Sequence, residues 1–396
     1  MFIIAEAGTS HQGSLEKAYK LIEKAAWAGA DCVKFQVVYA DEIIHPLSGK
    51  VKLPGGNISL YEKFKEFEKN ENFFQKLKQE AEKSGLVFLA TPFGVKSARM
   101  LKNIGVSAIK IASPELNHYP LLEEAASYNL ALILSGGVSA LSDIERAVEI
   151  TGRDITFLHA ITAYPAPEEE YNLALIQTLS AIFGFKTGVS DHSTDPLLVP
   201  LISAALGATT LEKHFTLDNS GGGLDDLIAL NPDNFKLMVS EIRSLFPLSP
   251  SRECTTPSSG AASILRPASV RPSLHSETFG GFNNSDCWQS LAQAGNSRLN
   301  ELKKRFGEEK VNRIIGSGIK ELAPSEKDNY KTTNRSLIAL RKIDAGETIR
   351  AEDFAALRSE KNLLPGLGPE YAKIITGKTV KKQINNGAGI TFEYFM

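Results

Sequence analysis

The chain opens with FIIAEAGTSHQGSLEKAYKLIEKAAWAGADCVKFQ over residues 2–36, and this stretch decides the fold. A short apolar run at 2–5 is followed by a segment with apolar residues at helical spacing, and then by a second apolar run at 32–37. Short apolar runs without alternation are typical of strands that are buried on both faces of a parallel sheet. The stretch therefore predicts a strand–helix–strand unit with parallel strands.

The same unit recurs as far as residue 246. Helix-like segments, several of which end in Gly or Asn, separate further apolar runs at 87–90, 108–112, 131–134, 155–159, 187–189 and 209–212. Eight strand–helix units within residues 1–246 predict an α/β fold, a (β/α)8 TIM barrel. An open doubly wound sheet is the rival, but near-equal units without a phosphate-loop fingerprint favour the barrel.

The rest of the chain has a different character. Residues 247–296 are rich in Ser, Pro and Gly and predict a poorly ordered insertion, and a helix is expected at 298–315. A linker over 316–332 leads to residues 333–396, where short alternating strands and Ala-Gly and Asn-Gly turns predict a small β-rich domain. The expected parts are thus a barrel (1–246), an atypical insertion with a helix (247–315), a linker and a small domain.

Composition limits the classes of function. The 396 residues are 42% hydrophobic and 23% charged, as in ordinary globular proteins. The net charge of −2 gives no overall field for nucleic acid or an anionic membrane. The three cysteines exclude a disulfide framework and a Cys-rich zinc site. Because we find no leader peptide and no apolar run long enough to span a membrane, we expect a soluble, cytoplasmic protein.

Polar residues stand at the ends of the expected strands, where barrel enzymes carry their active sites. One strand-end hydroxyl can simply satisfy the backbone, but here polar residues follow nearly every strand. They are Glu6, Lys34, Gln36, Thr91, Lys110, Ser113, Glu115, Ser135, Thr162, Tyr164, Ser190, His192, Glu212 and His214.

Lys34 and Lys110 lie inside apolar strands, and an unpaired buried ammonium group is costly. Each lysine could form a buried ion pair with Glu6, Glu115 or Glu212. Alternatively, both could face a phosphate or carboxylate group of a ligand. Together with the strand-end hydroxyls they describe an oxyanion site without a P-loop.

His192 and His214 end neighbouring strands, so their rings can converge. They could be structural residues or metal ligands. Two imidazoles with carboxylates and water fit Mn²⁺ or Mg²⁺ better than a closed zinc site. Asp225 and Asp226 lie in a Gly-rich loop, which is either a solvated turn or brings one carboxylate to the hydroxyls of a substrate.

The opening stretch resembles the sialic acid synthase family, which includes N-acetylneuraminate, pseudaminate and legionaminate synthases. The motifs TPF, IKIASPEL, LHAITAYPAP, GVSDHS and LEKHFTLD follow in the family's order, and residues 333–396 look like its antifreeze-like (SAF) domain. The resemblance covers about 1–246 and 316–396. It implies a transferase that condenses phosphoenolpyruvate with an N-acetylated amino-sugar aldehyde, which gives a nine-carbon 2-keto acid and phosphate. It also implies a domain-swapped homodimer, in which each small domain caps the partner's barrel.

The resemblance assigns roles to residues. It implies that Glu6 acts at the reacting centre, where it positions or deprotonates water or shields a cation, and that His192 and His214 bind the metal. Phosphoenolpyruvate contacts fall on Lys34, Thr91, Lys110, Ser113, Ser135 and Ser190, with Thr162 where the family has Asn. Positions that contact the sugar fall on Gln36, Tyr164 and Asp225, and we add Glu115 and Glu212 to this group.

Two departures bear on the sugar. Leu224-Asp225-Asp226 stands where the family often has Pro-Asp-His. The family arginine that reaches the N-acetyl group aligns with Asn362, next to Lys361 and four residues after Arg358. A 2,4-diacetamido-trideoxy hexose is therefore favoured at least as much as N-acetylmannosamine. The rival functions are a metal-dependent aldolase that does not use phosphoenolpyruvate and an inactive carbohydrate-binding or assembly protein.

Overall fold

The structure is a computed structural model, and it describes residues 1–53, 56–246, 284–360 and 362–396. Within these ranges no helix is both long enough and apolar enough to cross a membrane.

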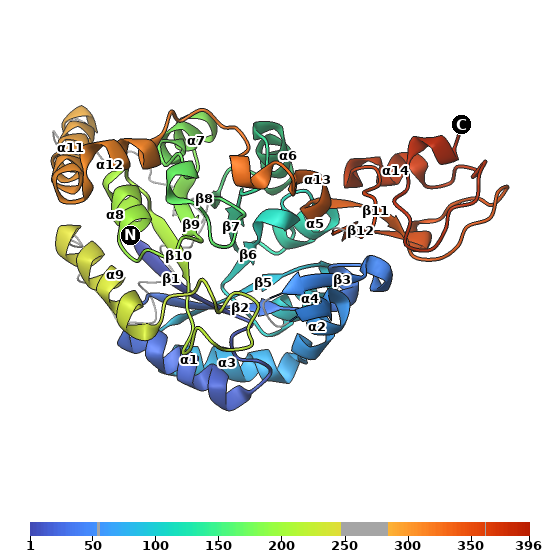
Figure 1. Ribbon diagram of the computed structural model, residues 1–396, viewed down its shortest axis with the longest axis horizontal. Coiled ribbons are helices and arrows are strands. Elements are labelled where there is room, and N and C mark those ends of the chain that lie inside the picture. Colours follow the sequence, from blue (N-terminus) through green and yellow to red (C-terminus); the bar gives the residue numbers. More distant parts are fainter. Residues whose placement is uncertain (54–55, 247–283, 361) are drawn as a thin grey trace, which may run out of the picture.

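Eight parallel strands form the centre of the molecule (Figure 1). Their order is β5-β2-β1-β10-β9-β8-β7-β6, and the two end strands, β5 and β6, lie beside each other and close the ring. The structure thus confirms the α/β barrel and excludes the open sheet. The strands are β1 (Phe2–Gly8), β2 (Cys32–Val37), β5 (Val87–Pro92), β6 (Ala108–Ile111), β7 (Ala131–Ser135), β8 (Ile155–Ala160), β9 (Lys186–Asp191) and β10 (Thr210–His214).

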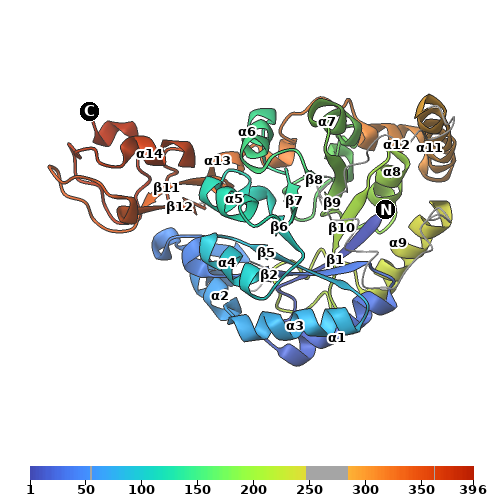
Figure 2. The same ribbon diagram turned by 180° about the vertical axis from the view of Figure 1, so that it is seen from behind.

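Helices surround the strands on the outside (Figure 2). Asn or Ser side chains cap α1, α3 and α9 by accepting a hydrogen bond from the first turn, which satisfies otherwise free N–H groups. The helices are α1 (Leu15–Trp27), α3 (Glu71–Lys83), α4 (Val95–Asn103), α5 (Tyr119–Ala126), α6 (Leu141–Thr151), α7 (Leu175–Phe183), α8 (Leu198–Ala205) and α9 (Pro232–Leu245).

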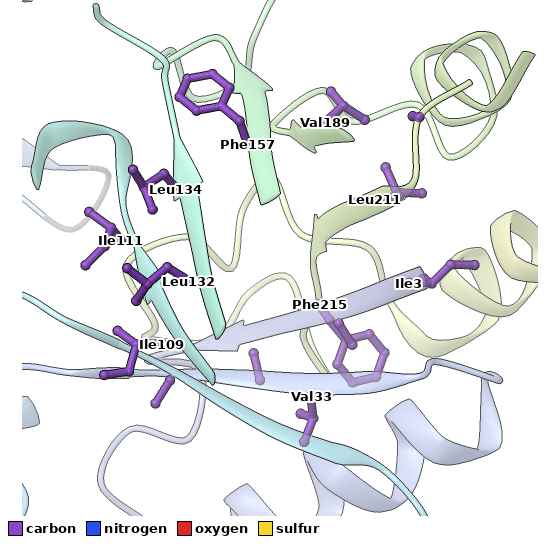
Figure 3. Packing of buried hydrophobic residues seen from close by; sticks show 14 of the residues in the cluster. Ile3, Val33, Ile109, Ile111, Leu132, Leu134, Phe157, Val189, Leu211 and Phe215 are labelled. Atoms are coloured by element: carbon purple, nitrogen blue, oxygen red, sulfur yellow. The ribbon is translucent and has the colours of Figure 1, made fainter. Parts of the chain in front are cut away.

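Side chains alternate along each barrel strand, because successive Cβ atoms point to opposite faces. Outward residues such as Ile3, Val33 and Leu211 pack against the helices in the main core, and Figure 3 shows this layer. Inward residues near the strand starts, such as Ile4 and Leu158, form a small separate apolar cluster that fills the bottom of the barrel. The next inward positions along the strands are polar and buried: Glu6, Lys34, Thr91, Lys110, Ser135, Ser190 and Glu212.

Several elements extend the barrel. An antiparallel hairpin of β3 (Lys50–Leu53) and β4 (Gly56–Ser59) precedes α2 (Leu60–Phe67). After α9, the long helix α11 (Asn284–Phe306) and the short helix α12 (Glu308–Ile315) pack against α8. The helix expected at 298–315 is therefore present, but it begins earlier, at a position expected to be poorly ordered, and is interrupted at Gly307. The expectation for 247–283 lies outside the described residues.

The small domain has its own core. It follows α13 (Tyr330–Thr333) and contains the antiparallel strands β11 (Arg335–Ala339) and β12 (Phe354–Arg358), and α14 (Ala372–Ile375). Buried aliphatic residues such as Leu337, Ile349 and Ile384 form that core. The domain lies beside the barrel of its own chain, where Arg358 N donates to Ile43 O at 2.9 Å. The family resemblance implies instead that the domain lies on a partner's barrel.

Candidate active site

Two buried lysines and two buried glutamates meet inside the top of the barrel. The Lys34 ammonium lies 2.9 Å from Glu212 Oε2 and 3.4 Å from Glu6 Oε2. Lys110 Nζ lies 3.9 Å from Glu212 Oε1 and donates to Ser135 Oγ at 2.6 Å. Of the two alternatives left open by the sequence, ion pairing is present in the structure, with Glu6 and Glu212 as partners. The same lysines still converge on one point, as a site for an anion requires.

The two lysines differ in their electrostatic environment. Burial disfavours the charged form of Lys34, but Glu212 and Glu6 outweigh it and hold the pKa of Lys34 above its usual value. Burial lowers the pKa of Lys110 to about 7, and Glu212 only partly opposes this. Lys110 therefore titrates near neutrality, whereas Lys34 stays charged.

The carboxyl group of Glu6 has a pKa close to neutral pH. Burial is the main cause that raises the pKa of Glu6 to about 7, and Lys34 counteracts it in part. Gln36 Nε2 donates to Glu6 Oε1 at 2.8 Å, which fixes the orientation of the carboxyl group. A buried carboxyl with such a pKa can take up or release a proton at physiological pH.

Hydroxyl groups surround the lysines. Lys34 Nζ lies 3.4 Å from Thr91 Oγ1, and Ser190 Oγ donates to Glu212 Oε1 at 2.8 Å. Ser113 Oγ accepts from Gly137 N at 3.0 Å in the loop after β7. The hydroxyl of Thr162 is buried and, within the described residues, has no hydrogen-bond partner. Such a group is a candidate to bind an atom of a ligand.

The two histidines lie next to each other with ring centroids 5.4 Å apart. Burial lowers the pKa of His192 to about 4 and that of His214 to about 3, with His214 and Lys34 as the next causes, so both rings are neutral at pH 7. His192 Nδ1 lies 2.6 Å from Ile161 O and must donate to it, because a carbonyl oxygen only accepts. Ser190 Oγ lies 3.3 Å from His192 Nε2 but donates its hydrogen to Glu212 Oε1, so the unprotonated Nε2 can still bind a ligand.

Tyr164 and Asp225 flank this pair. The half-exposed Tyr164 ring stacks on His192 with centroids 4.5 Å apart. Asp225 Oδ2 lies 3.7 Å from His214 Nδ1. Asp226, by contrast, is fully buried and accepts from Gly223 N at 2.7 Å, so it organises the Gly-rich loop. Of the two adjacent carboxylates, Asp225 is the one that lies at the site.

Two residues that we expected at the sugar have other partners. Glu115 is fully buried and pairs with Arg335 and Arg358 of the small domain. Although burial raises it, these arginines hold the pKa of Glu115 below its usual value. Glu212 lies between Lys34, Lys110 and Ser190. In this structure Glu115 thus belongs to the contact between the domains and Glu212 to the lysine centre, and a contact of either with a sugar stays a prediction.

The structure places Arg358, rather than Asn362, at the mouth of the barrel. The Arg358 guanidinium lies 5.5 Å from the centroid of the Phe93 ring, and its charge acts on the Tyr164 hydroxyl. Asn362 instead points to Lys50 O at 3.3 Å. Lys361 lies outside the described residues. Arg358 ends β12, so of these two residues it is the one that lies near the Tyr164 side of the site.

Sequence reasoning missed two buried charges. Arg335 is buried and bonds to the carbonyls of Phe93 and Ile43 besides Glu115. Lys213 lies 2.6 Å from Asp191 Oδ2 on the outer side of β10 and β9. The motif LEKHF was a signal for Lys213, since a lysine in a buried strand needs an anionic partner. No local pattern could reveal the burial of Arg335.

A cleft of about 650 Å³ lies where the small domain meets the barrel. Its lining includes Val95, His118, Leu337 and Leu357 and contains none of the site residues described above. It is therefore separate from the lysine centre.

The site suits catalysis on a small anionic compound, because its charged groups lie inside the strand ends of the barrel rather than on an open face. Comparison with known proteins gives the particular family. The model of the NeuB family matches residues 21–250, and that of the SAF domain matches residues 334–396. The chain belongs to the NeuB family, an enzyme family with relatives named as synthases of sialic, legionaminic and pseudaminic acids.

Similar proteins come from distant organisms. An uncharacterised protein of Methanocaldococcus jannaschii is 32% identical over 96% of this chain and 90% of its own length. The N,N'-diacetyllegionaminic acid synthase of Campylobacter jejuni is 38% identical over 61% of this chain and 75% of its own. The solved structure of the spore coat polysaccharide biosynthesis protein SpsE of Bacillus subtilis has a TM-score of 0.74 at 30% identity, and the match covers 100% of this chain and 95% of that one.

Proposed function

We propose that the chain condenses phosphoenolpyruvate with an N-acetylated amino-sugar aldehyde to give a nine-carbon 2-keto acid and phosphate. The observation that carries this proposal is the convergence of Lys34 and Lys110 on Glu212, with Glu6, whose pKa is about 7, lying 3.4 Å from Lys34. A multiply anionic substrate needs the lysines, and addition of water needs a group that accepts a proton. The names of the relatives support the class of product.

In this proposal the lysines and hydroxyls hold phosphoenolpyruvate. Lys34 and Lys110 neutralise its phosphate and carboxylate, and binding replaces part of their pairing with Glu212. The unpartnered Thr162 hydroxyl and the hydroxyls of Ser113 and Ser135 supply directional contacts around the loop after β7. Thr91 and Ser190 complete the set from β5 and β9.

Glu6 acts on the water that completes the reaction. The methylene carbon of phosphoenolpyruvate forms a bond to the aldehyde carbon, the aldehyde oxygen takes up a proton from solvent, and a cation is left at the neighbouring carbon. Water adds to that carbon and gives a proton to Glu6, which leaves a hydroxyl group there. The carbon–oxygen bond to phosphate then breaks and the hydroxyl gives its proton to the departing phosphate, so the ketone forms.

His192 and His214 are the residues that would hold Mn²⁺ or Mg²⁺. Both rings are neutral, and the Nδ1–H of His192 is donated to Ile161 O, so Nε2, which lies 3.3 Å from Ser190 Oγ, carries no proton and can ligate. Within the described residues, no group of three or more His, Cys, Asp or Glu is positioned to hold a metal ion by itself. Water or substrate would complete the shell, as octahedral cations allow. When bound, the ion supplies a Lewis acid that polarises the aldehyde.

We assign the sugar to the side lined by Gln36, Tyr164 and Asp225, with Arg358 as the contact to an acetamido group. Arg358 is paired on one side with Glu115, which presents its guanidinium near Tyr164. In this assignment Arg358 takes the role of the family arginine that reaches the N-acetyl group, so its absence at Asn362 no longer favours a diacetamido hexose over N-acetylmannosamine. Both sugars therefore belong in the test.

We also propose a homodimer. Arg358 and Arg335 could meet Glu115 of the same chain, as in the structure, or of the partner. Mixing Glu6→Gln and Arg358→Ala chains decides between these arrangements. Exchange of small domains restores activity in the mixture, because one barrel then has both Glu6 and Arg358. No recovery over the separate variants would rule out the exchanged form.

The function is tested by incubating the protein with phosphoenolpyruvate and each of several amino-sugar aldehydes, with and without a chelator. We expect phosphate release that depends on the sugar and a product whose mass equals both substrates plus water minus phosphoric acid. A condensation product without phosphate would favour the aldolase. Neither product nor phosphate with any sugar would contradict the proposal.

A further inference from the structure

The linker carries a buried carboxylate that the proposed reaction does not use. In Figure 1 the orange chain runs from α12 past α7 to α13, and Glu326 lies on this path. Its side chain is fully buried. Glu326 Oε1 accepts from Val138 N at 2.6 Å and from Thr162 N at 2.7 Å. One oxygen therefore ties together the loops that follow β7 and β8.

The bond to Thr162 N leads directly to His192. The N–H of Thr162 and the C=O of Ile161 belong to one peptide group, and that C=O accepts from His192 Nδ1 at 2.6 Å. Hydrogen bonds at the two ends of a peptide polarise each other in the same direction. The carboxylate, the peptide and the imidazole thus form one chain of hydrogen bonds from the linker to the site.

The bond to Val138 holds a strained residue. Val138 has a φ of +45°, which is unusual for a β-branched residue. Glu326 binds its N–H, and Asn334 Nδ2 donates to its carbonyl at 3.1 Å. Glu326 of the linker and Asn334 just after it therefore fix the loop that follows β7 on both sides of Val138.

We propose that Glu326 is a positioning residue for the reaction, which acts through the Ile161–Thr162 peptide to fix His192 as its Nδ1–H tautomer with Nε2 facing the site. The proposal rests on the proposed role of His192 as a metal ligand. Carboxylates that bond to a ligating histidine are known to orient the ring and raise its basicity. Here one peptide group is interposed.

A purely structural role for Glu326 would be to hold the linker. Glu170 offers a matched control, because its Oε2 accepts from Ser325 N at 3.1 Å and from Ser325 Oγ at 2.6 Å. It holds the same turn of the linker, but within the described contacts it does not bond to the Ile161–Thr162 peptide. Glu170→Gln loosens the linker but leaves the charge of Glu326 in the chain of hydrogen bonds that leads to His192.

The experiment uses the full chain labelled with ¹⁵N-histidine and free of metal, as wild type, Glu326→Gln and Glu170→Gln. In the wild type we expect the His192 signal, assigned by its loss in His192→Asn, to show a proton on Nδ1. Glu326→Gln keeps an acceptor oxygen but removes the charge, so it should shift this signal, whereas Glu170→Gln should not. A wild-type proton on Nε2, or equal signals in all three proteins, would overturn the proposal.

Binding of Mn²⁺ alone, followed by electron paramagnetic resonance, gives the second readout. We expect the dissociation constant to rise about tenfold in Glu326→Gln and to stay unchanged in Glu170→Gln. An equal rise in both variants would assign Glu326 to the linker alone. A wild type that binds no Mn²⁺ refutes the metal role, while the NMR comparison still decides on the tautomer. The wild-type spectrum also stands if a variant does not fold.

Discussion

At the scale of single residues, the buried ionisable groups of the site differ in their charge state near pH 7. Lys34 stays charged because two carboxylates face it, whereas Lys110 has one more distant carboxylate and a pKa near 7. Glu6 reaches a similar pKa from the opposite direction, since burial favours the neutral form of both groups and so raises the pKa of a carboxyl but lowers that of an ammonium. The sequence predicted that these groups are buried together, because each lies in an apolar strand. It could not predict which of the two lysines would have the lower pKa.

Replacing Glu6 should affect the chemical step. Glu6→Gln keeps the shape and the contact to Gln36 but cannot accept a proton, so we expect turnover to fall about 10²- to 10⁴-fold. Affinity for phosphoenolpyruvate should be retained, because the substitution removes a negative charge beside Lys34 that would repel the anionic substrate. Steady-state kinetics and calorimetry check this, with exposed Glu16→Gln as the control. Near-normal turnover would remove Glu6 from the mechanism.

Affinity for phosphoenolpyruvate should depend on pH through Lys110. The pKa of Lys110 is lowered to about 7, so the ammonium is present below this pH and is lost above it. Binding of the anion should therefore weaken above pH 7, by up to about tenfold per pH unit. Calorimetric titration of the wild type and Lys110→Met measures this effect. The variant should bind weakly with a flatter profile, and identical profiles would contradict the assignment.

At the scale of elements, the period of two along each strand places the site. Ile3 and Val33 face the helices, so Glu6 and Lys34, at odd separations from them, face the barrel interior. The apolar runs sufficed to predict the strands, and the barrel then placed their polar ends together. The long loops were less predictable. The sequence could not show that Arg358 lies at the site, because its position depends on the pairing of β12 with β11.

The loop after β7 should tolerate no side chain at Gly137. A Cβ atom there would lie 2.3 Å from Thr162 Oγ1 and 3.1 Å from Ser113 Oγ. Gly137→Ala should displace both hydroxyls and lower kcat/KM for phosphoenolpyruvate by about 100-fold. Kinetics with circular dichroism as a folding check measure it. A folded variant with unchanged kcat/KM would show that these hydroxyls do not bind substrate.

At the scale of the whole molecule, one buried carboxylate joins the two domains. Glu115 follows β6, whereas Arg335 and Arg358 belong to β11 and β12. These partners lie more than 200 residues apart, so no sequence pattern could connect them. For the same reason, no sequence pattern could predict the hydrogen bonds between Glu326 and the loops after β7 and β8. The fold and most of the site residues could be predicted, whereas the contacts that the distant C-terminal part makes could not.

Breaking this contact should release the small domain. Glu115→Gln leaves two buried guanidinium groups without their counter-charge, and such a loss costs about 3–5 kcal/mol. Denaturant unfolding should show the loss, and proteolysis should cut the linker sooner. The exposed pair of Lys373 and Glu123, 3.8 Å apart, provides the control, because Glu123→Gln should change neither. Equal effects of both variants would show that the Glu115 cluster does not hold the domains together.

The central claim is that this site joins phosphoenolpyruvate to an aldehyde and expels phosphate after water adds to carbon. The most direct measurement uses phosphoenolpyruvate with ¹⁸O in the oxygen that bridges carbon and phosphorus, together with the sugar that gives product. Mass spectrometry then locates the label. The account predicts that the released phosphate carries ¹⁸O and that the keto acid has taken its new oxygen from water. Label that stays in the keto acid would contradict it.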